Sequence, residues 1–223
     1  TPLQQPLPRP MTLSRRPWLL GAAAAVASVA TPAWLTPALA QTAQPSTPRR
    51  PTPGQTEGPF YPVRLPDDHD GDLLRHGNRR YDRGQAVWLD GVVTDLDGRP
   101  VQDAVVEIWQ CDHAGHYHHP GDGNRADPAF QGFGRVSVGR DGRYRFRTLR
   151  PAPYSGRTPH IHVKVRLDRM DLLTTQLYVA GDPGNERDFL WRRLDAAGRA
   201  ALTVPFTPGV DGLRAQFPIT VQL

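Results

Sequence analysis

The sequence contains very little cysteine and lysine, and its N-terminal part contains no acidic residue. Cys111 is the single cysteine among 223 residues, so no internal disulfide can form and the fold must be held by its core or by a metal. Lys164 is the only lysine. Three of the 27 basic residues precede position 41, which leaves 24 basic against 22 acidic groups. That near balance, without an arginine run or an aromatic and basic repeat, argues against a nucleic-acid partner.

Long apolar runs are also scarce, and the longest one, near the N-terminus, is interrupted by two prolines, which argues against a transmembrane anchor. Arg15–Arg16 precede this run and Ala38–Ala40 follow it, which gives the three parts of a cleaved secretory signal. Paired arginines resemble the twin-arginine type of signal, which exports folded proteins. We therefore expect a signal over residues 1–40 that starts at Met11, and a periplasmic or secreted protein without a membrane partner once the signal is removed.

The rest of the chain predicts a linker and one domain. Residues 41–55 contain Pro, Thr, Gln and Ser with almost no apolar side chain, so we expect a disordered linker there. Residues 56–223 are long enough for one core, and their short β-forming stretches are separated by Gly, Pro and Asp. This pattern predicts an all-β fold, a β-sandwich with one short helix and long loops. The expected strands are 87–94, 104–111, 143–148, 161–167, 172–179, 201–206 and 213–222, and the expected helix is 186–194.

The segment Pro159–Val165 carries the strongest chemical signal, a His-x-His pair on a predicted strand. Successive side chains of a strand point to opposite faces, so His160 and His162 share one face while Ile161 points to the other. Two imidazoles on one face can converge on one metal ion. Taken alone, the motif leaves open whether the histidines bind a metal or only belong to a polar sheet face.

Two tyrosines close to predicted strands favour the metal. Tyr117 follows one strand and Tyr154 precedes the His-x-His strand. A phenol with a pKa of about 10 is a poor ligand for a divalent ion at neutral pH, whereas a trivalent ion can hold it as a phenolate. Two phenolates and one hydroxide would neutralise Fe(III), and two neutral imidazoles would complete five ligand positions.

These residues belong to an ordered set of motifs that resembles the intradiol ring-cleaving dioxygenases, the family of protocatechuate and catechol dioxygenases. The resemblance covers essentially the whole predicted domain. The matching segments are Thr56–Tyr61, Trp109–Tyr117, Phe130–Arg135, Pro151–Tyr154, Arg157–His162, Thr175–Tyr178 and Gly181–Pro183.

The resemblance implies the site and its chemistry. It implies an Fe(III) cofactor held by Tyr117, Tyr154, His160 and His162, and an active site with Tyr154, Arg157 and Gln176 as catalytic residues. Tyr154 is implied to leave the metal when a catechol-type substrate binds, and O2 to cleave the ring to a cis,cis-muconate-type diacid. Between Tyr154 and Arg157 the chain is much shorter than in the familiar protocatechuate enzymes. One wall of the substrate pocket must therefore differ.

Other functions stay open at this point. The segments 91–101 and 141–146 also look like the transthyretin-like and carboxypeptidase-regulatory sandwiches, which share the scaffold without this chemistry. An exported protein that binds iron without turnover is a second alternative. Three further metal sites are conceivable from the sequence: a second metal at the His113–His119 tract, a copper ion at Cys111 with His113, and a calcium ion at Asp67–Asp70. For these three we favour a solvated loop, a buried thiol and a polar turn.

Overall fold

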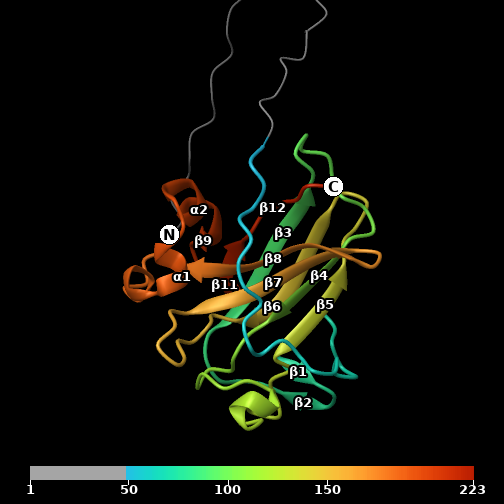
Figure 1. Ribbon diagram of the computed structural model, residues 1–223. Coiled ribbons are helices and arrows are strands. Elements are labelled where there is room, and N and C mark those ends of the chain that lie inside the picture. Colours follow the sequence, from blue (N-terminus) through green and yellow to red (C-terminus); the bar gives the residue numbers. More distant parts are fainter. Residues whose placement is uncertain (1–48) are drawn as a thin grey trace, which may run out of the picture. The chain divides into compact units, whose positions relative to one another are not determined.

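The computed structural model describes residues 49–223, and Figure 1 shows them as a β-sandwich with short helices on one side and the 3-10 helix η1 (Pro120–Asp122) in a loop at the bottom of the view. The predicted signal over 1–40 and the first part of the predicted linker, 41–48, lie outside the described residues. No helix in this described part of the chain has the length and hydropathy of a membrane span.

Two five-stranded sheets share one hydrophobic core. In the first sheet β3 is central, with β6 antiparallel on one side and β11 and β12 parallel to it. Its strands are β3 (Ala86–Thr94), β6 (Arg143–Leu149), β10 (Thr207–Gly209), β11 (Gly212–Gln216) and β12 (Ile219–Thr220). The second sheet has the order β5 (Phe133–Ser137), β4 (Val105–Trp109), β7 (His160–Leu167), β8 (Met170–Val179) and β9 (Thr203–Val204). A separate hairpin pairs β1 (Arg75–His76) with β2 (Arg79–Arg80).

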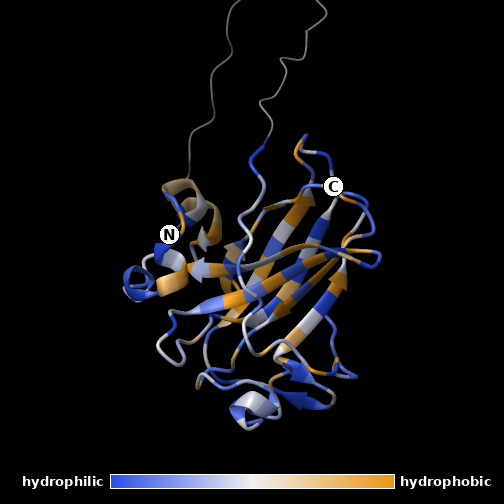
Figure 2. Cartoon of the chain, viewed as in Figure 1, coloured by the Kyte–Doolittle hydropathy of each residue, from blue (hydrophilic) through white to orange (hydrophobic). Residues whose placement is uncertain are grey.

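The period-two alternation of the strands places the core. Ile161, Val163 and Val165 of β7 are buried in the same cluster as Val87 of β3 and Phe146 of β6, so the two sheets pack face to face. Figure 2 shows the resulting alternation of hydrophobic and hydrophilic residues along the strands. The prediction of an all-β sandwich is confirmed. The opposite, outer face of β7 is free to carry polar side chains.

The region after β8 contains more helix than the single predicted one. The 3-10 helix η2 (Asn185–Arg187) and α1 (Phe189–Arg192) occupy the predicted helical range, and α2 (Ala196–Leu202) follows. The predicted strand 201–206 is therefore wrong at its start, because the alanine-rich segment favours a helix that Asp195 caps by accepting a hydrogen bond from Gly198 N at 2.7 Å. Only β9 remains of that strand.

One further strand prediction needs correction, and the strands β1, β2, β5 and β10 have no counterpart among the predicted ones. The predicted strand 213–222 is split into β11 and β12, because Pro218 between them has no N–H to donate to a ladder. The strand β5 was not predicted. Its sequence, Phe-Gly-Arg-Val-Ser, lacks a clear alternation, and it forms as the edge strand that pairs with β4.

The described part of the predicted linker, residues 49–55, is packed on the domain. Arg49 N donates to Leu96 O at 3.0 Å and Thr52 N to Thr220 O at 2.9 Å. The prediction of disorder rested on the lack of apolar side chains, but this segment is held by backbone hydrogen bonds, which composition does not reveal. The folded body thus begins before position 56.

Gly91 in the middle of β3 lies where the chain allows no side chain. A Cβ there would lie 2.3 Å from the ring of Tyr144 and 2.4 Å from the carbonyl oxygen of Phe217. We expect Gly91→Ala to lower the free energy of unfolding by about 3 kcal/mol, measured by urea denaturation. Gly54→Ala, whose Cβ would meet only Thr174 O at 3.7 Å, is the control and should change it by less than about 0.5 kcal/mol. Equal unfolding midpoints for the two variants would contradict this account.

Candidate functional site

His160 and His162 lie side by side on the outer face of β7. Both are buried, and their Nε2 atoms are 3.2 Å apart. Nδ1 of His160 donates to the carbonyl oxygen of Thr158 at 2.7 Å, so the proton sits on Nδ1 and the lone pair on Nε2. One ring face of His162 is covered by Trp109 of β4, stacked at 4.8 Å with an interplanar angle of 8°. The pair is therefore held rigidly by its surroundings.

Tyr154 reaches the histidines from a tight turn. Arg157 N donates to the carbonyl oxygen of Tyr154 at 2.7 Å, and both intervening residues, Ser155 and Gly156, have positive φ angles of 45° and 76°. Positive φ at both central residues is typical of a type I′ turn. The phenol oxygen of Tyr154 lies 3.1 Å from Nε2 of His160. The short connection noted in the sequence thus brings Tyr154 and Arg157 to the site together.

Tyr117 comes from the loop that follows β4. The carboxylate of Asp112 accepts hydrogen bonds from two backbone N–H groups of this loop at 2.9 and 3.0 Å. Gly115 is required, because its φ is 86° and a Cβ would lie 2.9 Å from the carbonyl oxygen of Pro153. The ring of Tyr117 meets that of Tyr154 edge to face at 5.0 Å. Its buried hydroxyl has no hydrogen-bond partner among the described residues.

Burial keeps all four side chains neutral. It lowers the pKa of His160 to about 4, with the charge of Arg157 acting in the same direction. The pKa of His162 is well below its ordinary value because of burial and of the neighbouring His160. Burial also raises the pKa of Tyr117 well above the ordinary value and raises that of Tyr154. The imidazoles therefore present lone pairs, and the phenols need a cation to lose their protons.

The geometry of this cluster fits a metal ion. Two ligand atoms bound at about 2.1 Å and at right angles lie about 3 Å apart, which is close to the observed separations of 3.2 and 3.1 Å around Nε2 of His160. The buried hydroxyl of Tyr117 would gain the partner that it lacks among the described residues. Phenols bind as phenolates only to a strong Lewis acid, so the donor set favours a trivalent ion over a divalent one.

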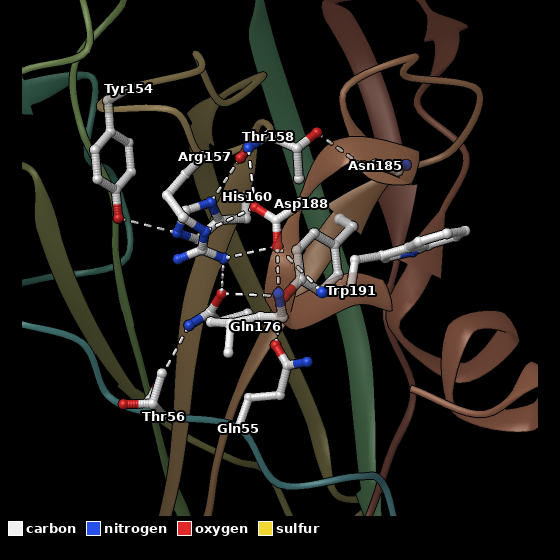
Figure 3. Close-up of polar contacts among 12 residues, drawn as sticks. Gln55, Thr56, Tyr154, Arg157, Thr158, His160, Gln176, Asn185, Asp188 and Trp191 are labelled. Atoms are coloured by element: carbon white, nitrogen blue, oxygen red, sulfur yellow. Dashed lines mark hydrogen bonds and ion pairs between the residues drawn. The ribbon is translucent and has the colours of Figure 1, made fainter. Parts of the chain in front are cut away.

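Arg157 lies beside this cluster and is held on two edges (Figure 3). Its Nε donates to Asp188 Oδ2 and its Nη2 to Gln176 Oε1, both at 2.7 Å. Nη2 is also 3.5 Å from Asp188 Oδ1. Nη1 has no hydrogen-bond partner among the residues that the structure describes. The guanidinium is thus fixed in orientation with one donor group uncommitted.

Asp188 is a site residue that the sequence did not single out. Burial tends to raise its pKa, but hydrogen bonds from Arg157 and from the backbone N–H groups of Trp191 and Thr158 outweigh burial and lower it. The same carboxylate caps α1 by accepting from Leu190 N at 3.0 Å. An aspartate directly before a predicted helix is a recognisable N-cap signal. Its contact with Arg157, 31 residues away, carries no such signal.

Aromatic side chains enclose the cluster on the side of the N-terminal segment. Phe60 stacks on Tyr117 at 4.6 Å and meets Tyr154 edge to face at 5.9 Å. Trp109, Cys111, Tyr117 and Phe133 form a second hydrophobic cluster, separate from the main core. Apolar walls lower the local dielectric constant, so the charge of Arg157 acts on the cluster more strongly than it would in water.

The remaining histidines, cysteine and aspartates make local contacts. His118 Nε2 bonds to Phe130 O at 2.5 Å, and Asp68 Oδ2 accepts from Gly77 N at 2.6 Å. Cys111 is a buried thiol whose pKa burial raises to about 12. Within residues 49–223 no three His, Cys, Asp or Glu side chains are grouped to hold a metal. The ion-binding geometry is thus that of two histidines with two tyrosines.

Two curated proteins that match this chain are ring dioxygenases by name. Hydroxyquinol 1,2-dioxygenase from Corynebacterium glutamicum is 33% identical over 144 residues, which cover 56% of this chain and 45% of that protein. Catechol 1,2-dioxygenase 1 from Acinetobacter lwoffii is 36% identical over 179 residues, 72% of this chain and 55% of that protein. The chain thus spans about half the length of the curated relatives it matches.

A solved structure and a family model complete the comparison. The dioxygenase domain of a dioxygenase and carbohydrate-binding protein fusion from Streptomyces sp. SirexAA-E has a TM-score of 0.63 and 29% identity, and the match covers 78% of this chain and 99% of that chain. The family model described as Dioxygenase matches residues 56–202, which include both tyrosines, both histidines, Arg157 and Gln176. The chain therefore belongs to the intradiol ring-cleavage dioxygenase family.

Proposed function

We propose that this protein is an Fe(III)-dependent intradiol dioxygenase that cleaves a catechol-type ring with O2 to a cis,cis-muconate-type diacid. The observation that carries the proposal is the meeting of four neutral donors, two imidazoles and two phenols, beside a fixed arginine. Membership of the family supports the same reaction class and disfavours a non-catalytic sandwich module.

In this proposal Tyr117, Tyr154, His160 and His162 hold the iron. When bound, Fe(III) supplies Lewis acidity that turns phenols and catechols into bound anions and activates the ring toward O2. Tyr154 Oη, once held as a phenolate, would take one proton from the catechol. Burial raises the pKa of the Tyr154 hydroxyl, so the released phenolate is a competent base.

Arg157 acts on the substrate directly, and Gln176 acts through Arg157. The uncommitted Nη1 of Arg157 stabilises negative charge that develops on the ring, because a preorganised donor in an apolar site needs no reorganisation. Gln176 accepts from Arg157 at 2.7 Å and so orients it. The aromatic walls exclude water from the reacting ring.

The names of the relatives support a substrate class. Their names specify catechol, hydroxyquinol and protocatechuate, which share a ring with two adjacent hydroxyl groups. We propose a substrate with that pair of hydroxyls for this chain. We also propose export, because the N-terminal sequence has the three parts of a secretory signal with paired arginines.

Metal analysis with a visible spectrum, before and after anaerobic catechol addition, tests the proposal. We expect stoichiometric iron, a purple-red tyrosinate band, and a shift of that band when catechol binds. The band should be lost in Tyr117→Phe and Tyr154→Phe. A colourless protein with no iron would refute the proposed iron site. A coloured protein that consumes no O2 with any catechol would refute the proposed reaction and favour an iron-binding protein without turnover.

A further inference from the structure

The segment 52–61, which we call the strap, crosses the outer face of the sheet that carries the site, as the cyan trace in Figure 1 shows. Gln55 in the strap donates through its backbone N to Thr174 O of β8 at 2.8 Å. Its side-chain Oε1 accepts from the hydroxyl of Tyr178 at 2.5 Å. The strap is thus joined to the same strand that carries Gln176.

The strap touches the polar side of the site through one carbonyl group (Figure 3). Nε2 of Gln176 donates to Thr56 O at 2.9 Å, and Oε1 of the same amide accepts from Arg157 at 2.7 Å. An amide has one donor end and one acceptor end. Because Thr56 O binds only the donor end, it fixes the acceptor end toward Arg157.

The strap touches the metal-binding side through a glycine and an aromatic ring. A Cβ on Gly58 would lie 3.2 Å from Cε1 of His162, so the backbone runs directly against the imidazole. Phe60 stacks on Tyr117. If the strap moved away from the sheet, His162, Tyr117 and the amide of Gln176 would therefore lose their contacts with it together.

Charged and polar side chains also hold the strap on the sheet. Glu57 forms an ion pair with Nζ of Lys164, whose side chain is only 7% exposed. The same Nζ lies 4.1 Å from the ring centroid of Tyr61, and Tyr61 donates its hydroxyl proton to the buried Glu107 at 2.8 Å. Lys164, the only lysine of the chain, follows His162 by two positions and shares its face of β7. Among the described residues, its one other ion pair is with Asp171 at 3.6 Å.

We propose that Glu57 and Lys164 are positioning residues: their ion pair holds the strap on the sheet, and the held strap keeps Gln176 and Arg157 in their working orientation. The kinetic part of this inference rests on the proposed function. The structural part does not. Glu57→Gln leaves the ammonium of Lys164, whose side chain is 7% exposed, without its partner in the strap, and Lys164→Met leaves the 43% exposed carboxylate of Glu57 without the cation that holds it against the sheet. Both changes therefore favour local opening of the strap.

Amide hydrogen exchange on the purified full chain tests the structural part without any turnover. In Lys164→Met we expect exchange of the backbone amides of 55–61 to rise about tenfold, with those of β6 unchanged. Asp171→Asn is the matched control, because Asp171 lies on β8 outside the strap and is the other acid beside Nζ of Lys164, at 3.6 Å, so its removal leaves the Glu57 pair in place. Unchanged exchange of 55–61 in Lys164→Met would overturn the proposal.

Steady-state kinetics test the positioning part. We expect Glu57→Gln and Lys164→Met each to lower kcat about tenfold with KM nearly unchanged, and Lys164→Arg to recover most of the loss. The double variant should be no worse than Lys164→Met alone, because the two changes remove one interaction. Faster exchange with an unchanged kcat would overturn the positioning role. If wild-type protein turns over no catechol at all, the proposed function fails while the exchange result still decides what holds the strap.

Discussion

Replacement of His162 by alanine is expected to abolish iron retention and ring cleavage together. His162 supplies a buried, neutral Nε2 placed 3.2 Å from that of His160. Without it the ion keeps one imidazole and loses the rigid pair that sets its position. We expect turnover to fall by at least about 10³-fold, beyond the 10- to 100-fold typical of residues that only support a ligand. Iron content per chain, measured on the same preparation, should fall in parallel.

His113→Ala is the control for this prediction. His113 is exposed on the loop near Tyr117, and its ring bonds to the hydroxyl of Tyr81 at 2.5 Å, away from the cluster. That variant should keep its iron and most of its activity. Because His162 also stacks on Trp109, thermal unfolding of both variants in metal-free form must be compared, so that loss of metal is separated from loss of fold. Full iron content and an unchanged tyrosinate band in His162→Ala would refute its role as a ligand.

The β-sandwich and the two histidine donors could be predicted from the sequence, because both follow from the local alternation of side chains along a strand. In β7 the alternation of Ile161 and Val163 with His160 and His162 states which side chains are buried in the core and which share the outer face. Motif order then added Tyr117 and Tyr154, which local periodicity alone does not connect with the histidines.

Other features were inaccessible because they depend on contacts between distant residues. Asp188 is recognisable as a helix cap, but not as the partner of Arg157. The packing of 49–55 depends on backbone groups, whose partners composition does not specify. The last two residues of α2, 201 and 202, lie where the sequence indicated the start of a strand, because a cap and an alanine-rich segment extend the helix to that point. In each case the missing information is the identity of the neighbour.

Asp188→Asn is expected to lower kcat by about 10- to 100-fold while the fold stays intact. Asn is as good an N-cap as Asp, so α1 keeps its cap, but the charge that pairs with Arg157 is lost. Of its two side-chain acceptors the guanidinium then keeps Gln176 alone, and its Nη1 is no longer aimed reproducibly at the ring. Because the lost interaction acts on developing charge, kcat should fall more than KM changes.

Asp195→Asn provides the matched control, since Asp195 caps α2 through Gly198 N at 2.7 Å and, within residues 49–223, forms an ion pair only with the exposed Arg50 at 2.9 Å. A surface pair of this kind contributes little, so kcat in that variant should stay within about twofold of wild type. Arg157→Lys should be at least as impaired as Asp188→Asn, because an ammonium cannot donate to Asp188, Gln176 and a substrate in one plane. Equal activity of the Asp188 and Asp195 variants would show that the carboxylate serves only the helix, and that Arg157 is oriented by Gln176 alone.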